Sequence, residues 1–449
     1  MQFAGAVSYL LSLGHETLTI KLGLQTTETL LNALGNPQRA FPAVQIAGTN
    51  GKGSTAAFVD SICRSAGIRT GLFTSPHLVS ITERIRVGGR QISEPEFARA
   101  TEIVKSTAEE LLARGELRAL PTFFEHLTAI ALVAFREAEV EWAILETGLG
   151  GRLDSTTAAR AKIVAITPIA MDHQEYLGNT LAQIAAEKAA IIRSDVIPII
   201  APQQEAAFEV ISRRCESVGV RPRLIDLSVV ASDSIGLRIG VSSVTTDGRA
   251  IASFQSDAAS YQNVQLALRG RHQVENAATA IAIAQALRER GLPISDEAII
   301  HGIETATHPG RLELWPGTPR ILFDGAHNPA AARSLRDYLA EFVAPPIVMM
   351  FGAMREKAVE EMMASLFPKA DKVILTSLDN PRASSVQELL AALPEDVAQA
   401  KIIRSSRLDD AIELAQRATP ANGIICITGS LYLVGTVQEM LRLSATHSR

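Results

Sequence analysis

The chain has 449 residues, 47% of them hydrophobic, and carries 43 Lys and Arg against 48 Asp and Glu for a net charge of −5. That is about three times the length expected of one domain, so two or three domains with full cores are expected. The absence of a basic block argues against nucleic-acid partners, and the absence of a long apolar run argues against membrane partners. Three isolated cysteines exclude a disulfide framework, and the apolar first fourteen residues lack the positive charge of a signal peptide, so a soluble, cytoplasmic protein is expected.

Strands and helices alternate through the first half of the chain. Short amphipathic helices are predicted at residues 5–14 and 26–34, and apolar runs predict strands at 43–49, 68–75, 139–146 and 161–168. Longer helices are predicted over 54–67, 126–138 and 179–192, the last opening with a capping-box pattern at Thr180 and Gln183. This alternation predicts an α/β fold whose parallel sheet binds ligands at the carboxyl ends of its strands.

The second half of the chain contains a change of pattern and then a second alternation. Residues 222–270 are rich in β-branched residues and turn formers, which predicts a small antiparallel sheet, and helix resumes at 272–291. Residues 307–320 contain three prolines and two glycines and are the linker candidate. Strands and helices alternate again from residue 321. Two α/β domains are therefore predicted, residues 1–307 and residues 308–449.

The segment AGTNGKGST, residues 47–55, is typical of a phosphate-binding loop between a strand and a helix. Its glycines let backbone N–H groups face an anion, and the helix start adds the positive end of its dipole. Lys52 can reach outer phosphates, and Ser54 or Thr55 can meet them or a magnesium ion. The usual P-loop would place a glycine at Ile46 and a hydroxyl at Gly53, so a simple glycine-rich turn with a solvated lysine is the alternative.

Three polar residues end strands of the same predicted sheet. Glu146 follows an apolar strand, where P-loop enzymes place a carboxylate associated with magnesium. Ser75 and His173 fall at the same edge, although a helix cap and a surface histidine are the simpler interpretations of each alone. Because Ser75 and His173 share this edge with Glu146, a functional role for them stays open beside the simpler one.

Four further residues have both a structural and a functional interpretation. Lys188 lies in a predicted helix among small apolar residues, where a lysine that extends to solvent or pairs with Glu187 is the simple explanation. Asn276 falls in the first turn of a helix and would be a cap. Arg311 fits an ordinary linker residue, whereas Asp324 ends a strand before a glycine turn, which favours a functional role.

Taken in order along the chain, these and neighbouring segments resemble the folylpolyglutamate synthases and bifunctional dihydrofolate synthase/folylpolyglutamate synthases of the Mur ligase superfamily. The superfamily's loop is a variant P-loop with Gly-Lys-Gly before Ser or Thr, which accounts for Gly53. The resemblance implies a P-loop Mur-ligase-type central domain and a smaller Rossmann-like C-terminal domain. The matching segments after the loop are LFTSPHL, ERIRV, TFFE, LETGLGGRLDST, DHQEYLGNT, EKAAII, HQVENAATA, HPGRLE, DGAHNP, FGAMREK and TGSLYLVG.

The resemblance also implies roles for individual residues. Two magnesium ions are implied, one of them bound with the help of a carbamate on Lys188, whose formation requires the neutral amine that burial favours. The implied catalytic residues are Lys52, Lys188, His173 and His327. The implied metal ligands are Ser75, Glu146, His173 and Lys188. The implied ATP contacts are Gly48, Thr49, Asn50, Gly51, Lys52, Gly53, Ser54, Thr55, Asn276, Arg311 and Asp324.

A folate or pterin site is implied beside the nucleotide. Its residues are Thr122, Phe123, Phe124, Glu125, Leu153, Asp154 and Ser155, and the phenylalanines suit a flat ring. Residues 19–24 are expected to close over this site, where Lys21 replaces an acidic residue of some bifunctional relatives. His327 and Arg84 are candidates for holding glutamate or phosphate.

The expected reaction is ATP-dependent amide ligation. A carboxylate of a folate or of dihydropteroate attacks the γ-phosphorus, and the amine of L-glutamate then attacks the acyl phosphate. A cell-wall Mur ligase is the nearest alternative, disfavoured because the 46 residues before the loop suggest no UDP-sugar-binding domain. A regulatory P-loop ATPase is the other alternative. A monomer is expected.

Overall fold

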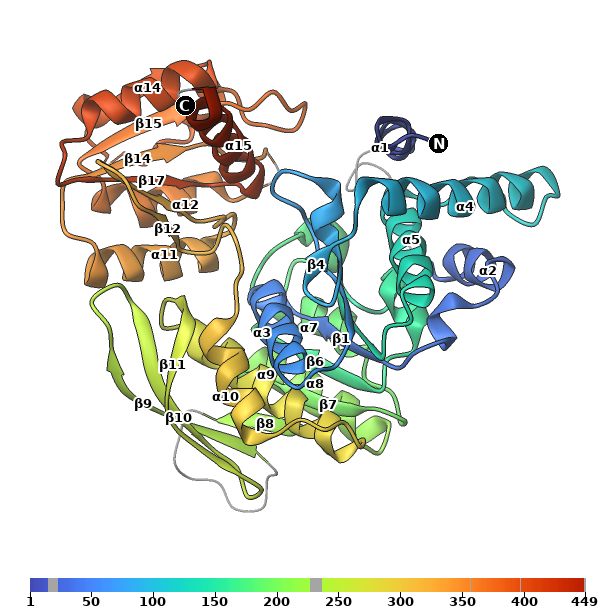
Figure 1. Cartoon of the computed structure of the whole chain (residues 1–449). Coiled ribbons are helices and arrows are strands. Elements are labelled where there is room, and N and C mark those ends of the chain that lie inside the picture. Colours follow the sequence, from blue (N-terminus) through green and yellow to red (C-terminus); the bar gives the residue numbers. More distant parts are fainter. Residues whose placement is uncertain (15–22, 227–235, 356, 396, 448–449) are drawn as a thin grey trace.

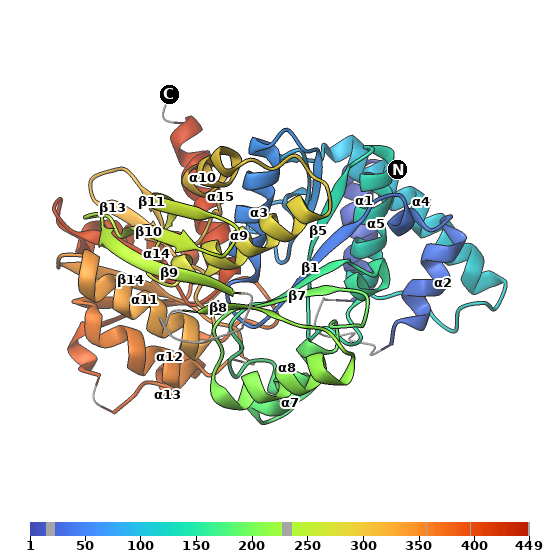
Figure 2. The same cartoon turned by 90° about the horizontal axis from the view of Figure 1, so that it is seen from below.

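The computed structural model describes residues 1–14, 23–226, 236–355, 357–395 and 397–447 (Figure 1). Within these ranges the chain forms one sheet of eleven strands and one of six. The helices and strands of the second sheet gather on one side of the molecule, and the N-terminal helices lie on the other (Figures 1 and 2). Among the described helices, none is both long and apolar enough to cross a membrane.

The large sheet has a parallel centre with antiparallel strands at both ends. Its order is β11-β10-β9-β8-β7-β6-β1-β5-β2-β3-β4, and the run from β9 to β2 is parallel. Its bounds are β1 Ala43–Ala47, β2 Thr70–Phe73, β3 Ile85–Val87, β4 Arg90–Gln91, β5 Trp142–Glu146, β6 Ile163–Ile166, β7 Ile197–Ile200, β8 Arg223–Asp226, β9 Gly236–Val244, β10 Arg249–Gln255 and β11 Ser260–Arg269. The predicted antiparallel strands therefore exist, but they extend the main sheet, because β9 pairs in parallel with β8.

Helices cover both faces of the parallel centre, and this explains why its strands are continuous apolar runs. Along β1, Val44 and Ile46 point to one core while Ala43 and Ala47 point to the other. The first core is closed by α3 (Lys52–Ser65), α9 (Gln273–Glu289) and α10 (Asp296–Thr305). The second is closed by α1 (Phe3–Ser12), α2 (Gln25–Ala33), α4 (Glu94–Ala113), α5 (Phe123–Glu137), α7 (Leu181–Ala189) and α8 (Glu205–Ser217).

The C-terminal sheet is likewise covered on both faces. Its order is β12-β13-β17-β14-β15-β16, with bounds β12 Glu313–Trp315, β13 Arg320–Phe323, β14 Ile347–Phe351, β15 Lys372–Thr376, β16 Ile402–Ser405 and β17 Ile424–Thr428. One face packs on α11 (Pro329–Phe342), α12 (Val359–Leu366) and α13 (Val386–Ala391), and the other on α14 (Leu408–Ala418) and α15 (Leu431–His447). Part of the predicted linker thus forms β12, which pairs with β13.

The predicted alternation and fold class are confirmed, and the two sheets approach each other at a functional edge. The loops that follow β1, β2, β5 and β6 face the loops that follow β13, β14 and β17, because residues from both sets line one cavity. Polar residues at the carboxyl ends of strands in the two sheets are therefore brought together there.

Candidate active site

The cavity between the two sheets has a volume of about 710 Å³. Nearly all the residues predicted from the sequence line it, although they come from segments up to 280 residues apart. They are Gly48, Thr49, Asn50, Gly51, Lys52, Gly53, Ser54, Ser75, Thr122, Phe124, Glu125, Glu146, Leu153, Asp154, Ser155, His173, Lys188, Asn276, Arg311, Asp324 and His327.

Besides the candidate Arg84, two predicted residues, Thr55 and Phe123, are not among those that line the cavity. Both are buried, and the Thr55 hydroxyl has no hydrogen-bond partner among the described residues. Phe123 is the first residue of α5, and the guanidinium of Arg84 lies over its ring, 5.6 Å from the centroid. Arg84 is itself fully buried and donates from Nε to His77 Nδ1 at 2.8 Å, so its position is interior.

The P-loop runs from Gly48 to the start of α3 at Lys52. Gly48 and Gly51 have φ angles of 150° and 89°, which favour glycine, and a Cβ on Gly51 would collide with the Asn276 side chain. The first N–H groups of α3 have no acceptor within the helix, and the loop residues that carry them line the cavity. Together with the helix dipole they form a site suited to phosphate oxygens.

Two lysines converge on the same loop carbonyl. Lys188 Nζ donates to the Gly48 oxygen at 2.8 Å, and Lys52 Nζ donates to the oxygens of Gly48 and Thr49 at 3.2 and 3.1 Å. Burial lowers the pKa of Lys52, against the opposing effect of Glu146. Burial, and then the charge of Lys52, lowers the pKa of Lys188 to about 7. A substantial fraction of Lys188 is therefore neutral at physiological pH.

Ser75, Glu146 and His173 all line the cavity, and Ser75 and Glu146 are in direct contact. The Ser75 backbone N–H donates to Glu146 Oε2 at 3.2 Å, and burial raises the pKa of this carboxyl against the opposing charge of Lys52. His173 has a left-handed backbone, φ 50°, and burial lowers the pKa of its imidazole to about 4. Its ring is therefore neutral at pH 7, which is the form that binds metals.

These residues fit a divalent cation that shares its ligands with a nucleotide. Within the described part of the chain, no three His, Cys, Asp or Glu side chains gather as a metal cluster. A single buried carboxylate, a serine hydroxyl and an imidazole at the cavity wall leave the other positions to phosphate oxygens and water. Magnesium is usually bound in this way, by few protein ligands and a substrate phosphate.

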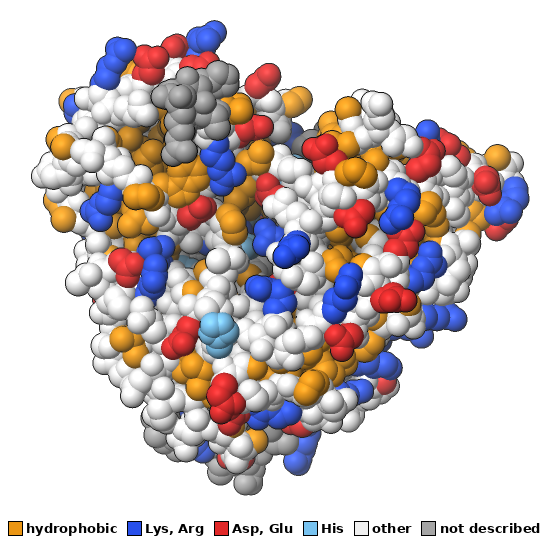
Figure 3. Space-filling view, in the orientation of Figure 1, with side chains coloured by type: hydrophobic (Ala, Val, Ile, Leu, Met, Phe, Trp, Pro, Cys, Tyr) orange, Lys and Arg blue, Asp and Glu red, His pale blue; other side chains and the backbone are white. Residues whose placement is uncertain are grey.

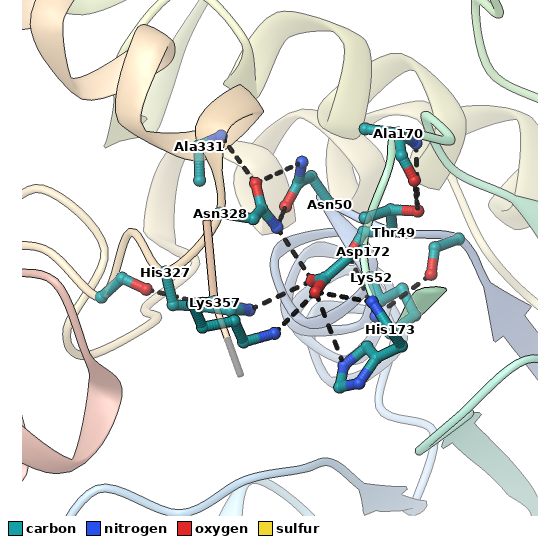
Figure 4. Close-up of polar contacts among 12 residues, drawn as sticks. Thr49, Asn50, Lys52, Ala170, Asp172, His173, His327, Asn328, Ala331 and Lys357 are labelled. Atoms are coloured by element: carbon teal, nitrogen blue, oxygen red, sulfur yellow. Dashed lines mark hydrogen bonds and ion pairs between the residues drawn. The ribbon is translucent and has the colours of Figure 1, made fainter. Parts of the chain in front are cut away.

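Asp172, which sequence reasoning missed, joins the two sheets at the cavity (Figure 4). Its Oδ1 accepts from Lys357 Nζ at 2.6 Å, and its Oδ2 accepts from Asn328 Nδ2 at 3.1 Å. Although burial alone would raise the pKa of Asp172, it is lowered well below the ordinary value by His173, which is protonated at the low pH where this carboxyl titrates, and by Lys357. The available signal was its position directly before His173 in DHQEYLG.

His327 approaches the same carboxylate from the second sheet. Its Nε2 lies 3.9 Å from Asp172 Oδ2, and its Nδ1 lies 2.9 Å from the Gly325 oxygen. Burial, followed by the charge of Lys357, lowers the pKa of His327 to about 3. The imidazole is therefore neutral, and because Nδ1 donates to the Gly325 oxygen, Nε2 can accept one hydrogen bond in the cavity.

Two successive side-chain hydrogen bonds link Asn276 of α9 to Ser54, at the end of the phosphate-binding segment. Asn276 Nδ2 donates to Gln273 Oε1 at 2.9 Å, and Gln273 Nε2 donates to Ser54 Oγ at 3.3 Å. Gln273 also lines the cavity and was missed by sequence reasoning, although it belongs to the HQVEN segment. Asn276 thus has a position beside the nucleotide loop that a helix cap alone would not require.

Arg311 and Asp324 shape the cavity wall of the second sheet. Arg311 Nη1 donates to the Gly325 oxygen at 3.1 Å, and Asp324 accepts from the backbone N–H groups of Leu312 and Ala326 at 3.0 Å each. Burial raises the pKa of Asp324, and the charge of Arg311 opposes this. The carboxylate therefore holds together the two backbone segments that carry Arg311 and His327.

The predicted folate wall brings both apolar and polar side chains to the cavity. Phe124 packs so closely on Gly148 that a Cβ there would lie 2.5 Å from the ring, and it lies 5.7 Å from the Phe73 ring. Glu125 accepts from the Thr122 N–H at 2.7 Å and from Thr27 at 3.0 Å. Asp154 accepts from the N–H groups of Gly148 and Leu149, and Ser155 Oγ lies 2.5 Å from Thr128 Oγ1. Lys21 and residues 19–22 lie outside the described residues.

Comparisons with known proteins agree with this geometry. Residues 46–284 match the Mur ligase middle domain, and residues 310–431 match the Mur ligase glutamate ligase domain. The chain is 34% identical to dihydrofolate synthase/folylpolyglutamate synthase of Bacillus subtilis over 434 residues, which cover 96% of this chain and 97% of that protein.

Solved structures of the same kind share the whole fold. Folylpolyglutamate synthase of Mycobacterium tuberculosis complexed with ADP has a TM-score of 0.88 at 31% identity, over 97% of this chain and 98% of that one. A bifunctional folylpolyglutamate synthase/dihydrofolate synthase with Mn, AMPPNP and L-glutamate bound has a TM-score of 0.83 at 28% identity, over 98% of both chains. The chain therefore belongs to the Mur ligase superfamily and, within it, to the dihydrofolate synthase/folylpolyglutamate synthase family.

Proposed function

We propose that this protein is an ATP-dependent ligase that adds L-glutamate to a folate and to dihydropteroate through an acyl phosphate. The observation that carries the proposal is a single cavity that combines the P-loop and Lys52, the carboxylate of Glu146 and the apolar wall of Phe124. Such a cavity would accommodate phosphate chemistry and a flat aromatic acid side by side. The relatives' names and bound ligands support the same conclusion.

In this reaction the acceptor carboxylate attacks the γ-phosphorus, and the amine of L-glutamate then displaces phosphate from the acyl phosphate. The N–H groups of residues 51–54 and the ammonium of Lys52 would hold the phosphates and offset the charge that develops in transfer. Arg311 and His327 would contact the phosphates from the second sheet, while Asn276 and Asp324 would contact the nucleotide. Closure of the two sheets would exclude water from the acyl phosphate.

Magnesium, when bound, supplies charge neutralisation at the phosphate oxygens. Ser75, Glu146 and His173 would hold one ion beside Lys52. A carbamate on Lys188 would contribute to a second, and the buried position of Lys188 with its pKa of about 7 supports this because carbamate formation requires the neutral amine. Asp154 and Glu125 would act by fixing the folate wall, since their oxygens accept hydrogen bonds from their own loops.

The proposal also includes expectations about domain division, cellular location and oligomeric state. The chain would divide near residue 308 into an ATP- and folate-binding domain and a C-terminal domain. It would act as a cytoplasmic monomer on small-molecule substrates. A cell-wall Mur-type ligase is disfavoured by the whole-chain match to folate enzymes, and a regulatory P-loop ATPase by the size and apolar wall of the cavity.

The direct test is ADP formation by the purified protein with ATP, magnesium and L-glutamate. Dihydropteroate and tetrahydrofolate are compared as acceptors, each with and without glutamate. We expect ADP only when an acceptor and glutamate are both present. Activity with both acceptors identifies a bifunctional enzyme, and ADP formation that ignores them contradicts the proposal.

A further inference from the structure

Asp172 is the meeting point of three segments that are distant in sequence. It follows β6, whereas Lys357 follows β14 and Asn328 precedes α11, both in the C-terminal part (Figure 4). The Asp172 and Lys357 side chains are only 8% and 10% exposed, and their charged atoms are 2.6 Å apart. This is a buried ion pair across the two sheets.

Asn328 extends the contact to the P-loop. Its Nδ2 donates to Asn50 Oδ1 at 3.0 Å as well as to Asp172, and its Oδ1 accepts from Asn50 Nδ2 at 3.4 Å and from the Ala331 N–H at 2.9 Å. One amide therefore caps α11 and contacts both the loop and the carboxylate.

The loop and the Asp172 segment are also joined directly. Thr49 Oγ1 donates to the Ala170 oxygen and accepts from the Ala170 N–H, each at 3.1 Å. The N–H groups of Thr49 and Asn50 donate to the Pro168 oxygen. Hydrogen bonds thus connect the P-loop to Pro168 and Ala170, in the segment whose Asp172 contacts Lys357 and Asn328.

The ion pair has a consequence for closure, because a buried charge is tolerated only while it is paired. If Lys357 loses its charge, Asp172 keeps the Asn328 amide and the His173 N–H but no formal countercharge from the second sheet. The carboxylate then gains by becoming hydrated, and with no countercharge opposite it less holds the C-terminal part against the cavity.

We propose that Lys357 and Asn328 are positioning residues that hold the C-terminal sheet over the cavity, and that Asp172 receives both of them and fixes the segment that carries His173. Their effect on catalysis rests on the proposed function. Their effect on the distance between the two parts of the molecule does not.

Spin labels test this distance without any substrate. The three native cysteines are buried, so labels can be placed at Glu109→Cys on α4 and Asp409→Cys on α14, two exposed positions on opposite sides of the molecule (Figure 1). Pulsed electron–electron double resonance should give one narrow distribution of the distance between the two labels when Lys357 is present. Lys357→Met should broaden and shift it.

A second variant separates loss of the pair from general damage. Asp172→Asn combined with Lys357→Met removes both charges, and the narrow distribution should largely return. Glu341→Gln is the matched control, because the Arg271–Glu341 pair also joins the two parts but is exposed to solvent. A narrow distribution in Lys357→Met, or one equally broad in the double variant, overturns the proposal.

Kinetics add a readout that a merely structural residue would not change. Lys357→Met should lower kcat by about tenfold to a hundredfold, the usual range for coupling between sites, with a much smaller change in the KM for ATP. Lys357→Arg, which keeps the charge, should recover part of the loss. An unchanged kcat in Lys357→Met contradicts the inference. A wild-type protein without ligase activity contradicts the proposed function instead, and the spin-label distances then test the inference about Lys357 on their own.

Discussion

The ammonium of Lys188 lies 2.8 Å from the carbonyl oxygen of Gly48, so α7 is hydrogen-bonded to the first residue of the P-loop. A lysine that merely extended to solvent would not be 5% exposed and directed at this loop. The contact connects the residue proposed for carbamylation with the residues proposed to hold phosphate.

Removal of the Lys188 amine is expected to abolish ligation. Lys188→Ala should lose activity and regain little of it in high bicarbonate, because no amine remains to be carbamylated. Nuclear magnetic resonance with 13C-bicarbonate should show a carbamate signal in the wild-type protein that is missing in the variant. Full activity of Lys188→Ala would refute the carbamate role.

The same lysine predicts a dependence on pH. Because its pKa is about 7 in the folded protein, below the ordinary lysine value of 10.5, the neutral amine becomes abundant as pH rises through 7. Carbamylation should therefore increase with pH over that window. The unfolded chain holds this proton more tightly, so the ionised lysine costs stability near pH 7, and that cost disappears as the pH rises toward 10.5. Lys188→Met should accordingly not lower the thermal midpoint at pH 7, which separates lost chemistry from lost folding.

A methyl group on Gly53 is expected to damage the loop. A Cβ there would lie 2.8 Å from His308 Nε2 and 3.5 Å from Glu146 Oε2. Gly53→Ala should therefore raise the KM for ATP, measured in the ligase assay, and adding His308→Ala should recover part of the loss. Gly5→Ala is the control, since nothing lies within 4 Å of its added Cβ in α1. Equal ATP kinetics in Gly53→Ala and the control would contradict the crowding argument.

Many of the cavity residues could be predicted because each lies in a short segment with its own sequence pattern. The ends of β2, β5 and β6 were identified from apolar runs, whereas the metal role of Ser75 and His173 came from the family resemblance and stays a prediction. The Asp172–Lys357 pair could not be predicted, because it depends on how two sheets approach across 185 residues. Prolines and glycines around Glu313–Trp315 indicated a linker, whereas pairing with β13 makes those residues a strand.

Loss of the Glu146 carboxylate is expected to weaken binding of the divalent cation. Glu146→Gln keeps the size of the side chain but removes the charge that a cation would meet at the end of β5. Titration with Mn²⁺ in the presence of AMPPNP, followed by electron paramagnetic resonance, should show weaker binding than in the wild type.

Glu141→Gln is the matched control for this measurement. Glu141 lies just before the opposite end of β5, where it accepts a hydrogen bond from the Arg69 N–H in an exposed position. It should leave Mn²⁺ binding unchanged. Equal binding in all three proteins would remove Glu146 from the metal site.

Truncation of Phe124 is expected to affect the acceptor more than ATP. Its ring lines the cavity beside Gly148, and aromatic pairs contribute about 0.5–1.5 kcal/mol, so Phe124→Leu should raise the KM for dihydropteroate by up to about tenfold. Steady-state kinetics with each substrate varied would show this. An equal rise in the KM for ATP would indicate general distortion and not a folate contact.

The most direct test of the central claim follows one oxygen atom through the reaction. If the acceptor carboxylate attacks the γ-phosphorus, a carboxylate labelled with ¹⁸O must transfer one labelled oxygen to the phosphate that is released with ADP. We predict one ¹⁸O in each phosphate formed, detected by mass spectrometry, and only when L-glutamate is present. Released phosphate without ¹⁸O, whose fourth oxygen comes from water, would contradict the acyl-phosphate ligase and favour a simple ATPase.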